Sequence, residues 1–442
     1  MRLRCLAVGL LLTTALSAAE RPSIPARLTL REALSIALDR SPALRLAAAR
    51  ERQAEGETQL ARSELMPHLG VTVSQASMTR NLAVLGLTDK TLGGRDVQSR
   101  VGPFGVFDAR VAVTQDVFDL SERRQYKAAG QRREAAVAGS LDVREELTYK
   151  VVTAYIDALR AQASSATLRK QMALARQLHT ITVDRLEQGV ASRLDERRAL
   201  QQTHNLQQLL LEAESMAETA KLQLSAVIHA KPTAEYELAD VHLFYDVASI
   251  EPQEVVGKAL AARPDAKAAA ARLRAAETDR KAAQAISLPR VSFYADYGQS
   301  GNQLYANLNT YTVRGQVGVP IYFGGRASAE RQRAQAGVDA AAAELEQIQA
   351  EIEAEALAGA AQVESARRQV EVASEGVSLA EEEIDLTTAR FTSGAADNTE
   401  LLAAQDRLAR AEENRIRALY RLNLARAALH RATGQAEQTY RN

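Results

Sequence analysis

The chain has 442 residues, of which 25% are charged, and its 55 basic and 55 acidic side chains cancel. A balanced surface gives no reason to expect a nucleic-acid partner, because phosphates call for a basic excess. Aromatic residues make up only 4% and tryptophan is missing. Such a composition is unusual for a globular domain and natural for long helices that pack closely along their lengths.

The first twenty residues have the three parts of a secretory signal peptide. A basic start precedes an apolar run from Cys5 to Leu16, and small residues end at Ala19 before Glu20. The run is about a dozen residues, shorter than a helix needs to cross about 30 Å of hydrocarbon. A buried core helix is the alternative. We expect residues 1–19 to be a signal peptide.

Cys5 is the only cysteine and would leave with the signal peptide. We therefore expect no disulfide and no cysteine-ligated metal in the mature chain. Cys5 also stands too early, and among the wrong neighbours, to carry the lipid of a bacterial lipoprotein, so no lipid anchor is expected. No later stretch approaches 18 uninterrupted apolar residues. Any part that enters a membrane must then do so as strands closed into a barrel.

The chain repeats one plan twice. Several residues recur 222 positions later (Ala37-Leu38, Pro42, Arg50, Ala54-Glu55 and Pro67) and others recur 205 positions later (Phe118, Ala129, Arg185, Gly189, Ala220 and Leu224). The first copy is therefore 17 residues longer than the second between Pro67 and Phe118. Because length changes are tolerated in exposed loops and not inside packed helices, this difference predicts a loop there.

Each copy begins with a helix that leads into a hairpin. The helices run from Leu30 to about Leu65 and from about Val255 to Ser287, and each contains a proline near its start. Apolar and polar residues then alternate within segments 69–118 and 291–319. Alternation with period two predicts half-exposed strands. A soluble β-domain and a lipid-facing barrel would both show this pattern.

Each hairpin leads into a proline-free helix, about 121–188 and about 328–393. Some 65 residues at 1.5 Å each make a rod of about 100 Å. The second rod has an apolar seam with spacings of three and four, formed by Val363, Ala366, Val370, Ala373, Val377, Ala380 and Ile384. Such a seam is typical of a coiled coil. Glycine-marked turns end both rods, and further helices follow at about 194–226 and about 399–433.

These elements divide the mature chain into repeat 1 (20–230), a connector (231–254), repeat 2 (255–434) and a C-terminal tail (435–442). The connector contains aromatic residues, so it predicts a small packed patch on the outside of the rods. The apolar seams of lone rods cannot be buried by one chain. Several copies are therefore expected to pack together.

Three motifs carry a resemblance to a known family: Leu28-Thr29-Leu30-Arg31-Glu32-Ala33-Leu34, Pro320-Ile321-Tyr322-Phe323-Gly324-Gly325-Arg326, and Arg390-Phe391-Thr392-Ser393-Gly394 followed by Glu400-Leu401-Leu402-Ala403-Ala404-Gln405. With the two copies and the rods, they make nearly the whole mature chain similar to the TolC family of outer-membrane efflux proteins. The resemblance implies an α+β membrane protein that forms a homotrimer. Four strands per chain would form a 12-stranded β-barrel, continued by a long antiparallel α-helical coiled-coil barrel.

The resemblance also implies a function and partners. The chain would be the outer-membrane exit duct of a tripartite efflux pump or a type I secretion system in a Gram-negative-type cell. It would conduct substrates passively, without a cofactor. Its partners would be outer-membrane lipid, a periplasmic adaptor (membrane fusion) protein and an inner-membrane pump.

In the family, acidic rings line the narrow periplasmic tip, where a carboxylate ring attracts cations. The resemblance places the first gate aspartate at Glu400, with Asp195 as its counterpart in copy one, and the second at Ala403. Asp397 is a further candidate for the pore constriction. For all three acids, a first-turn position favoured by the helix dipole is the alternative.

Two further departures bear on the closed state. The family's tyrosine before the turn glycine is Phe391 here, and its arginine after that glycine is Ala396. We therefore expect a weaker or differently latched closed state. The residues expected at the helix-turn tips, where an adaptor would dock, are Gly189, Gly394, Arg185, Arg390 and Phe391. Those expected at the junction between barrel strands and helices are Pro320, Phe323, Gly324, Gly325 and Phe118.

No enzyme chemistry is visible in the sequence. Gly324-Gly325-Arg326 lacks the second spaced glycine and the lysine of a phosphate-binding loop. The six histidines are scattered, and His179 corresponds to the seam residue Ile384, which favours a structural role. The rival to a duct is a secreted periplasmic coiled-coil adaptor or structural spacer, whose strands would form a soluble domain.

Overall fold

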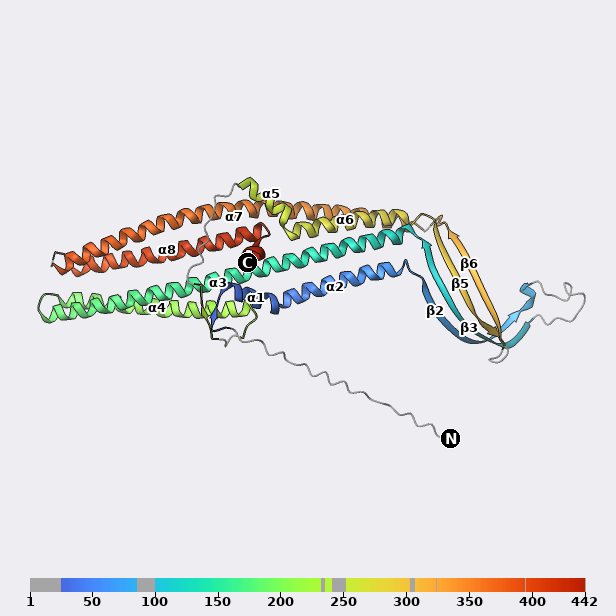
Figure 1. Cartoon of the computed structure of the whole chain (residues 1–442), viewed down its shortest axis with the longest axis horizontal. Helices are drawn as coiled ribbons and strands as arrows, with labels where there is room; N and C mark the ends of the chain where they lie inside the picture. Colours follow the sequence, from blue (N-terminus) through green and yellow to red (C-terminus); the bar gives the residue numbers. More distant parts are fainter. Residues whose placement is uncertain are drawn as a thin grey trace, which may run out of the picture.

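The computed structural model describes residues 25–85, 100–231, 235–240, 252–302, 307–322, 324–393 and 395–441. The molecule is a long bundle of helices with a sheet at one end, and the C-terminus lies near the middle of the bundle (Figure 1). The expected signal peptide, residues 1–19, lies outside the described residues.

The same order of elements occurs in both halves of the chain. The first half contains α1 (Leu30–Arg40), α2 (Pro42–Ser63), β2 (His68–Asn81), β3 (Arg100–Phe118), α3 (Leu120–Glu187) and α4 (Arg193–Val227). The second half contains α5 (Pro252–Ala262), α6 (Pro264–Ala285), β5 (Arg290–Gly301), β6 (Asn307–Gly318), α7 (Arg326–Thr392) and α8 (Asn398–Ala432). The short elements are β1 (Arg27–Leu28), the 3₁₀ turn η1 (Leu82–Leu85), β4 (Glu237–Leu238) and α9 (Ala436–Arg441).

The two early prolines each divide a helix in two. Pro42 and Pro264 are the first residues of α2 and α6, and the residues before them, Ser41 and Arg263, have ψ of 123° and 130°. Proline has no N–H to donate and disfavours the helical conformation of the residue before it. Each predicted first helix is therefore a pair of helices with a break.

The strands form one antiparallel sheet in the order β2-β3-β5-β6. Val71, Val111, Tyr297 and Tyr311 lie in one row across it. Their exposed fractions are 71%, 43%, 60% and 76%. Neighbouring residues along each strand point to the opposite, more polar face. The predicted alternation is therefore real, and it gives the sheet an exposed apolar face.

The sheet has two free edges in the described part of the chain. The strands β2 and β6 each pair on one side only, and the contact between β3 and β5 joins the two halves of the sequence. The outer edge of each terminal strand thus leaves a row of backbone N–H and C=O groups to find partners elsewhere.

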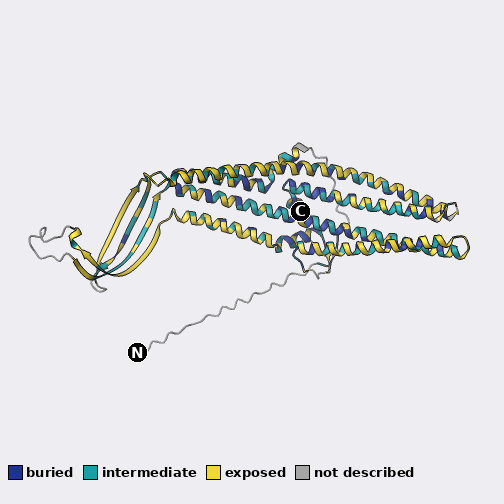
Figure 2. Ribbon diagram, turned by 180° about the vertical axis from the view of Figure 1, so that it is seen from behind, coloured by how far each residue is buried: buried dark blue, intermediate teal, exposed yellow. Residues whose placement is uncertain are grey.

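The helices bury these apolar seams in pairs within one chain, so the expectation that several copies are needed to bury them was wrong. The predicted seam of α7 includes Val363, Ala366, Val377 and Ala380, all buried, and α7 packs along α8. Buried residues gather towards the middle of the rod, whereas the strands and outer helix surfaces are largely exposed (Figure 2). Among the described residues, no helix is both long enough and apolar enough to cross a membrane.

The largest core cluster lies at mid-length and includes part of the predicted connector. Tyr155 of α3 is fully buried, and its hydroxyl oxygen lies 2.9 Å from the Leu28 carbonyl oxygen and 2.8 Å from Asp240 Oδ2, so these two acceptors share its one proton. Tyr236 packs in the same cluster, and β4 pairs with β1 in parallel. The other connector aromatics, Phe244 and Tyr245, lie outside the described residues.

The C-terminal tail contains a helix that the sequence did not predict. The Ala436 N–H at the start of α9 donates to Glu145 Oε2 of α3 (2.8 Å), and Arg144 Nε donates to Glu437 Oε2 (2.9 Å). Burial raises the pKa of Glu145. A six-residue helix is not stable alone, so it forms because α3 holds it.

Gly298 is a position where the sheet admits no side chain. A Cβ atom there would lie 2.3 Å from the Ala109 carbonyl oxygen and 2.6 Å from the Arg110 Cα. We expect Gly298→Ala to lower the stability of the purified protein by about 1–3 kcal/mol through overpacking, measured by thermal unfolding. Gly315→Ala is the matched control, because nothing lies within 4 Å of that position in β6. Equal effects of the two substitutions would contradict the expectation.

Candidate functional site: the helix tips

The turns between paired helices lie together at the end of the rod opposite the sheet (Figure 1). The turn from α3 to α4 contains Gly189, which has φ of +73°. This left-handed conformation favours glycine, as the sequence predicted for the end of the rod. Gly394, expected in the corresponding turn between α7 and α8, lies outside the described residues.

Two of the three candidate acids take part in helix caps, Asp195 as the third helical residue of a capping box and Asp397 as an N-cap residue. The Asp195 carboxylate accepts hydrogen bonds from the Ser192 Oγ (2.6 Å) and N–H (3.0 Å), and these bonds lower its pKa. Asp397 precedes α8, and its Oδ1 accepts a hydrogen bond from the Glu400 N–H at 2.8 Å. Both carboxylates therefore have the local role that the helix dipole favours.

Glu400 forms an ion pair with the end of the preceding rod. Its Oε1 lies 2.5 Å from Arg390 Nη1, and Arg390 Nη2 lies 3.4 Å from the Ala395 carbonyl oxygen. One guanidinium thus joins α7, the turn and α8. The sequence indicated both residues as tip residues but did not predict that they pair, because the bond depends on how the turn folds back.

Phe391 joins the two helical hairpins at the tip. It is 8% exposed and packs with Leu178 of α3 and Leu401 of α8. The Arg185 guanidinium lies 4.3 Å from the centre of its ring, a distance at which cation–π attraction operates. The aromatic ring thus remains a contact point in the absence of a tyrosine hydroxyl.

A polar contact also crosses between the hairpins. Arg198 Nη1 of α4 donates to Thr399 Oγ1 of α8 at 3.1 Å. This hydrogen bond, the Arg390–Glu400 ion pair and the Arg185–Phe391 contact link the tip within one chain. They differ from the contacts that the resemblance implied. A differently latched closed state stays a prediction.

His179 of α3 lies near the start of α4. His179 is partly buried, and its Nε2 lies 3.7 Å from Glu196 Oε1. Over the part of the chain that the structure describes, no three histidine, cysteine or acidic side chains are grouped for metal binding. A structural role for His179 stays a prediction.

The junction between strands and helices also depends on glycine. Gly324 and Gly325 have φ of +58° and +85°, and Gly325 directly precedes α7. These left-handed residues turn the chain from β6, through Pro320, into the rod. In the first half, Arg123 lies 5.3 Å from the ring centre of Phe118. Phe323, also expected at this junction, lies outside the described residues.

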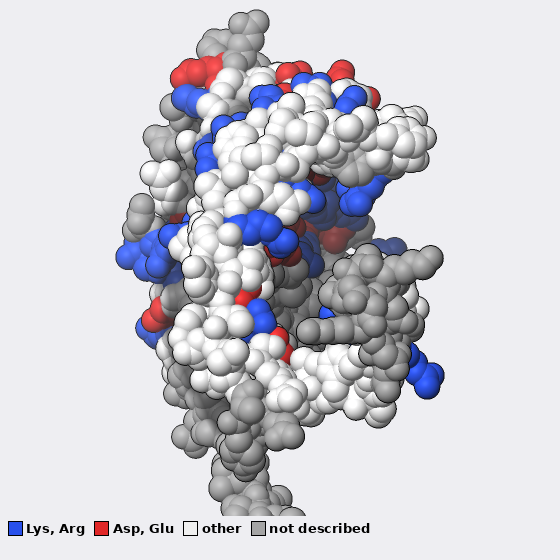
Figure 3. All heavy atoms as spheres, turned by 90° about the vertical axis from the view of Figure 1, so that its right-hand side faces the viewer, with Lys and Arg blue, Asp and Glu red and all other residues white. Residues whose placement is uncertain are grey.

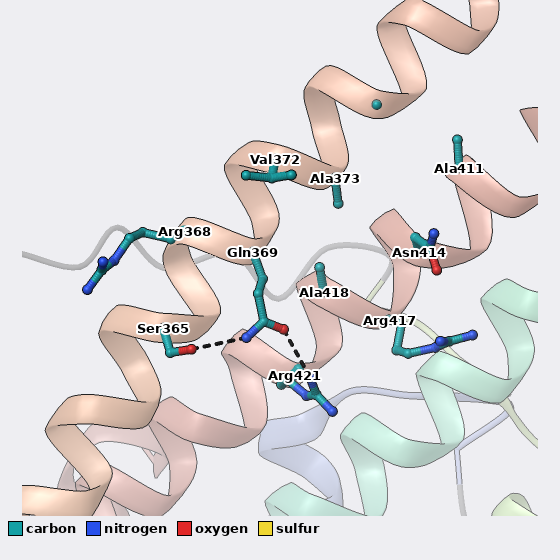
Figure 4. A pocket seen from close by; sticks show the side chains of 11 residues that line it. Ser365, Arg368, Gln369, Val372, Ala373, Ala411, Asn414, Arg417, Ala418 and Arg421 are labelled. Carbon is teal, nitrogen blue, oxygen red and sulfur yellow. Dashed lines mark hydrogen bonds between the residues drawn. The ribbon is translucent and has the colours of Figure 1, made fainter.

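A groove of about 770 Å³ runs between α7 and α8. In Figure 4, Gln369 lies between Ser365 and Arg421, with hydrogen bonds of 3.1 Å to Ser365 Oγ and 2.9 Å to Arg421 Nη1. Small residues (Ala373, Gly376, Ala411 and Ala418) and further arginines (Arg368 and Arg417) complete its lining. Sequence reasoning did not find this groove, because its two walls are about fifty residues apart.

The fold is that of a class of outer-membrane channels. The structure of the outer membrane protein VceC from Vibrio cholerae superposes with a TM-score of 0.79 at 20% identity, covering 92% of this chain and 96% of that one. The MtrE outer membrane channel of Neisseria gonorrhoeae gives 0.76 at 19% identity, covering 92% and 89%. At these identities, the likeness concerns the fold.

The family profile described as "Outer membrane efflux protein" matches residues 33–228 and 255–435, and the chain belongs to this family of outer-membrane proteins. Among curated proteins, the pyoverdine export outer membrane protein OpmQ of Pseudomonas putida is 26% identical over 70% of this chain. OpmQ of Pseudomonas aeruginosa is 24% identical over 69%. The chain covers 64% and 63% of the lengths of these two relatives.

The buried ring at the tip should matter more to local stability than the exposed ion pair beside it. We expect Phe391→Ala to accelerate amide hydrogen exchange at the start of α8 by about tenfold or more, because truncating a buried phenylalanine costs several kcal/mol. Arg390→Ala, the control, should accelerate it only a few-fold, since exposed ion pairs contribute about 0–1 kcal/mol. Hydrogen exchange with mass spectrometry measures both. A larger effect of Arg390→Ala would show that Phe391 does not hold the tip.

Proposed function

We propose that the chain is the passive exit duct of a tripartite export system, crossing the outer membrane with its strands and the periplasm with its helices. The exposed apolar face of the sheet is the observation that carries this proposal. In water such a face is costly, whereas in hydrocarbon it is favourable. The 68 residues of α3, at 1.5 Å each, supply a rod of about 100 Å to reach across the periplasm.

A homotrimer is the assembly that satisfies the free edges. In hydrocarbon every backbone polar group needs a partner. Pairing of β6 with β2 of the next copy would close three four-stranded sheets into a barrel of twelve strands. Seen from the sheet end, the chain curves around a hollow that charged side chains enter (Figure 3). Three such curved units would enclose one passage.

The long helices support the same assembly. Val372, Leu379 and Leu386 recur every seven residues on α7 and are exposed. A heptad stripe of this kind is the seam of a coiled coil that another helix buries. We propose a helix of the neighbouring copy as that partner. The helix tips, with Arg185, Arg390 and Phe391, would then be free to contact a periplasmic adaptor, and an inner-membrane pump would supply the energy.

Pyoverdine export appears in the names of both curated relatives, and these names favour a small molecule over a protein as the cargo. We propose that the duct is gated at its tip, with Glu400 supplied by each copy as the acidic ring. Pairing with Arg390 fixes the position of the Glu400 carboxylate. Asp195 and Asp397 would act as caps rather than as gate residues.

Membrane fractionation distinguishes a duct from the rival, a secreted adaptor or spacer. We expect the chain to stay in the outer-membrane fraction after a high-salt wash and to come free only in detergent, since a barrel is held by apolar contact with lipid. An adaptor or spacer held by charges would dissociate in salt. A monomer that dissolves in plain buffer with full helical content would contradict the proposal.

Substitutions at the tip test the gate in planar bilayers. We expect Glu400→Ala to lower the preference for cations by roughly twofold or more, because a carboxylate ring in a narrow pore favours cations. Asp397→Asn is the matched control, since asparagine retains the helix cap without the charge. If Asp397→Asn lowers the preference and Glu400→Ala does not, the ring belongs to Asp397. If neither does, the acidic gate is wrong.

A further inference from the structure

The polar face of the sheet carries one arginine that is already neutralised. Arg110 of β3 contacts Asp108 (Nε to Oδ1, 2.5 Å) and Asp296 of β5 (Nη1 to Oδ1, 2.8 Å). The Asp296 side chain is only 3% exposed. Charge-assisted hydrogen bonds of this kind are strong and directional. Two carboxylates thus bind the Arg110 guanidinium at the sheet, so its charge is not available to a solute.

Arg314, on the same face, has a different environment. It lies on β6 directly across from Tyr294 of β5, and its guanidinium carbon is 5.3 Å from the centre of the tyrosine ring. Arg314 is exposed, and within the described residues it forms no ion pair with a carboxylate. A guanidinium stacked on an aromatic ring keeps its full charge and leaves its edge N–H groups free to donate.

Tyr294 lies on β5, an inner strand of the sheet. Asp296, the buried carboxylate that also holds Arg110, lies two residues along the same strand and on the same face. The tyrosine ring therefore gives Arg314 a surface to stack on, beside an aspartate that is already paired with another arginine.

We infer that Arg314, stacked on Tyr294, attracts anions in the strand-lined part of the duct and favours the passage of solutes that carry negative charge. This inference rests on the proposed function, in which the polar face lines water and three copies bring three Arg314 side chains around one passage. A ring of cations in a low-dielectric wall raises the local concentration of anions. Arg314 would thereby select solutes at the opposite end of the duct from Glu400.

A reporter thiol measures the charge beside Arg314 without relying on the tip. Position 312 lies two residues along β6, on the same face, so we introduce Thr312→Cys into the full chain. The assembled protein in outer-membrane vesicles is treated with anionic and with cationic methanethiosulfonate reagents. The rate constant for the anionic reagent divided by that for the cationic reagent is the quantity measured. The parent chain, whose one cysteine is Cys5, gives the background.

We expect Arg314→Gln to lower this ratio roughly threefold or more, since a nearby unit charge acts within about one Debye length. Arg314→Lys should retain it, because the charge stays. The same ratio is also measured with Arg314 unchanged, at a second reporter thiol, Ser74→Cys. Ser74 lies on β2, directly across from Asp108 of β3. The ratio should be higher at position 312 than at position 74.

A thiol on the other face separates the inference from the proposed function. We expect Tyr311→Cys, on the apolar face, to be protected from both charged reagents. If it reacts as fast as Thr312→Cys, the membrane placement is wrong, and the inference with it. If Tyr311→Cys is protected and Thr312→Cys reacts, the membrane placement holds. The inference alone is then wrong if Arg314→Gln leaves the ratio unchanged. It is also wrong if the ratio at position 312 does not exceed the ratio at position 74.

Discussion

Unsatisfied backbone hydrogen bonds at the edges of the four-stranded sheet constrain everything else in this molecule. A strand of 12 or 14 residues with one free edge is a template for pairing, and in hydrocarbon such an edge costs several kcal/mol per group. The sheet also presents an apolar face that water disfavours. In the proposed assembly, a neighbouring copy on each side would satisfy both edges.

The helices depend on the same closure. Each half of the chain buries one seam of its long helix within the protomer, and α7 keeps a second apolar stripe exposed. Alanine at many buried positions allows helices to approach closely, so the wall can be a single layer of coiled coils around a space. A rod of this kind cannot fill its own interior, which is the property that a duct requires.

Ion pairs and charged hydrogen bonds fix how some strands and helices sit against one another, where apolar packing alone would allow several arrangements. Arg110 joins β3 to β5 through Asp296, Glu145 holds α9 against α3, and Arg390 joins α7 to α8 at the tip. The first two are largely buried and therefore set register and docking strictly. The third is exposed and contributes less, which is compatible with the gated tip proposed above.

The sequence alone determined the order of elements, because its signals are local. Periodicity changes from helix to strand, prolines mark breaks such as the one at Pro42, and Gly189 marks a turn; each depends on a few neighbouring residues. The match between copies predicted a loop between β2 and β3, where residues 86–99 lie outside the described residues. The family motifs indicated the tip. Asp195 and Asp397 could be weighed as caps from their positions at helix starts.

Only the tertiary structure decided which residues meet across the chain. The pairing of Arg390 with Glu400, the stacking of Arg185 on Phe391 and the stacking of Arg314 on Tyr294 join segments that no periodicity connects. Helix α9 likewise exists because Glu145, about 290 residues earlier, accepts its first N–H. Side-chain contacts of this range depend on register and packing, which local propensity does not encode.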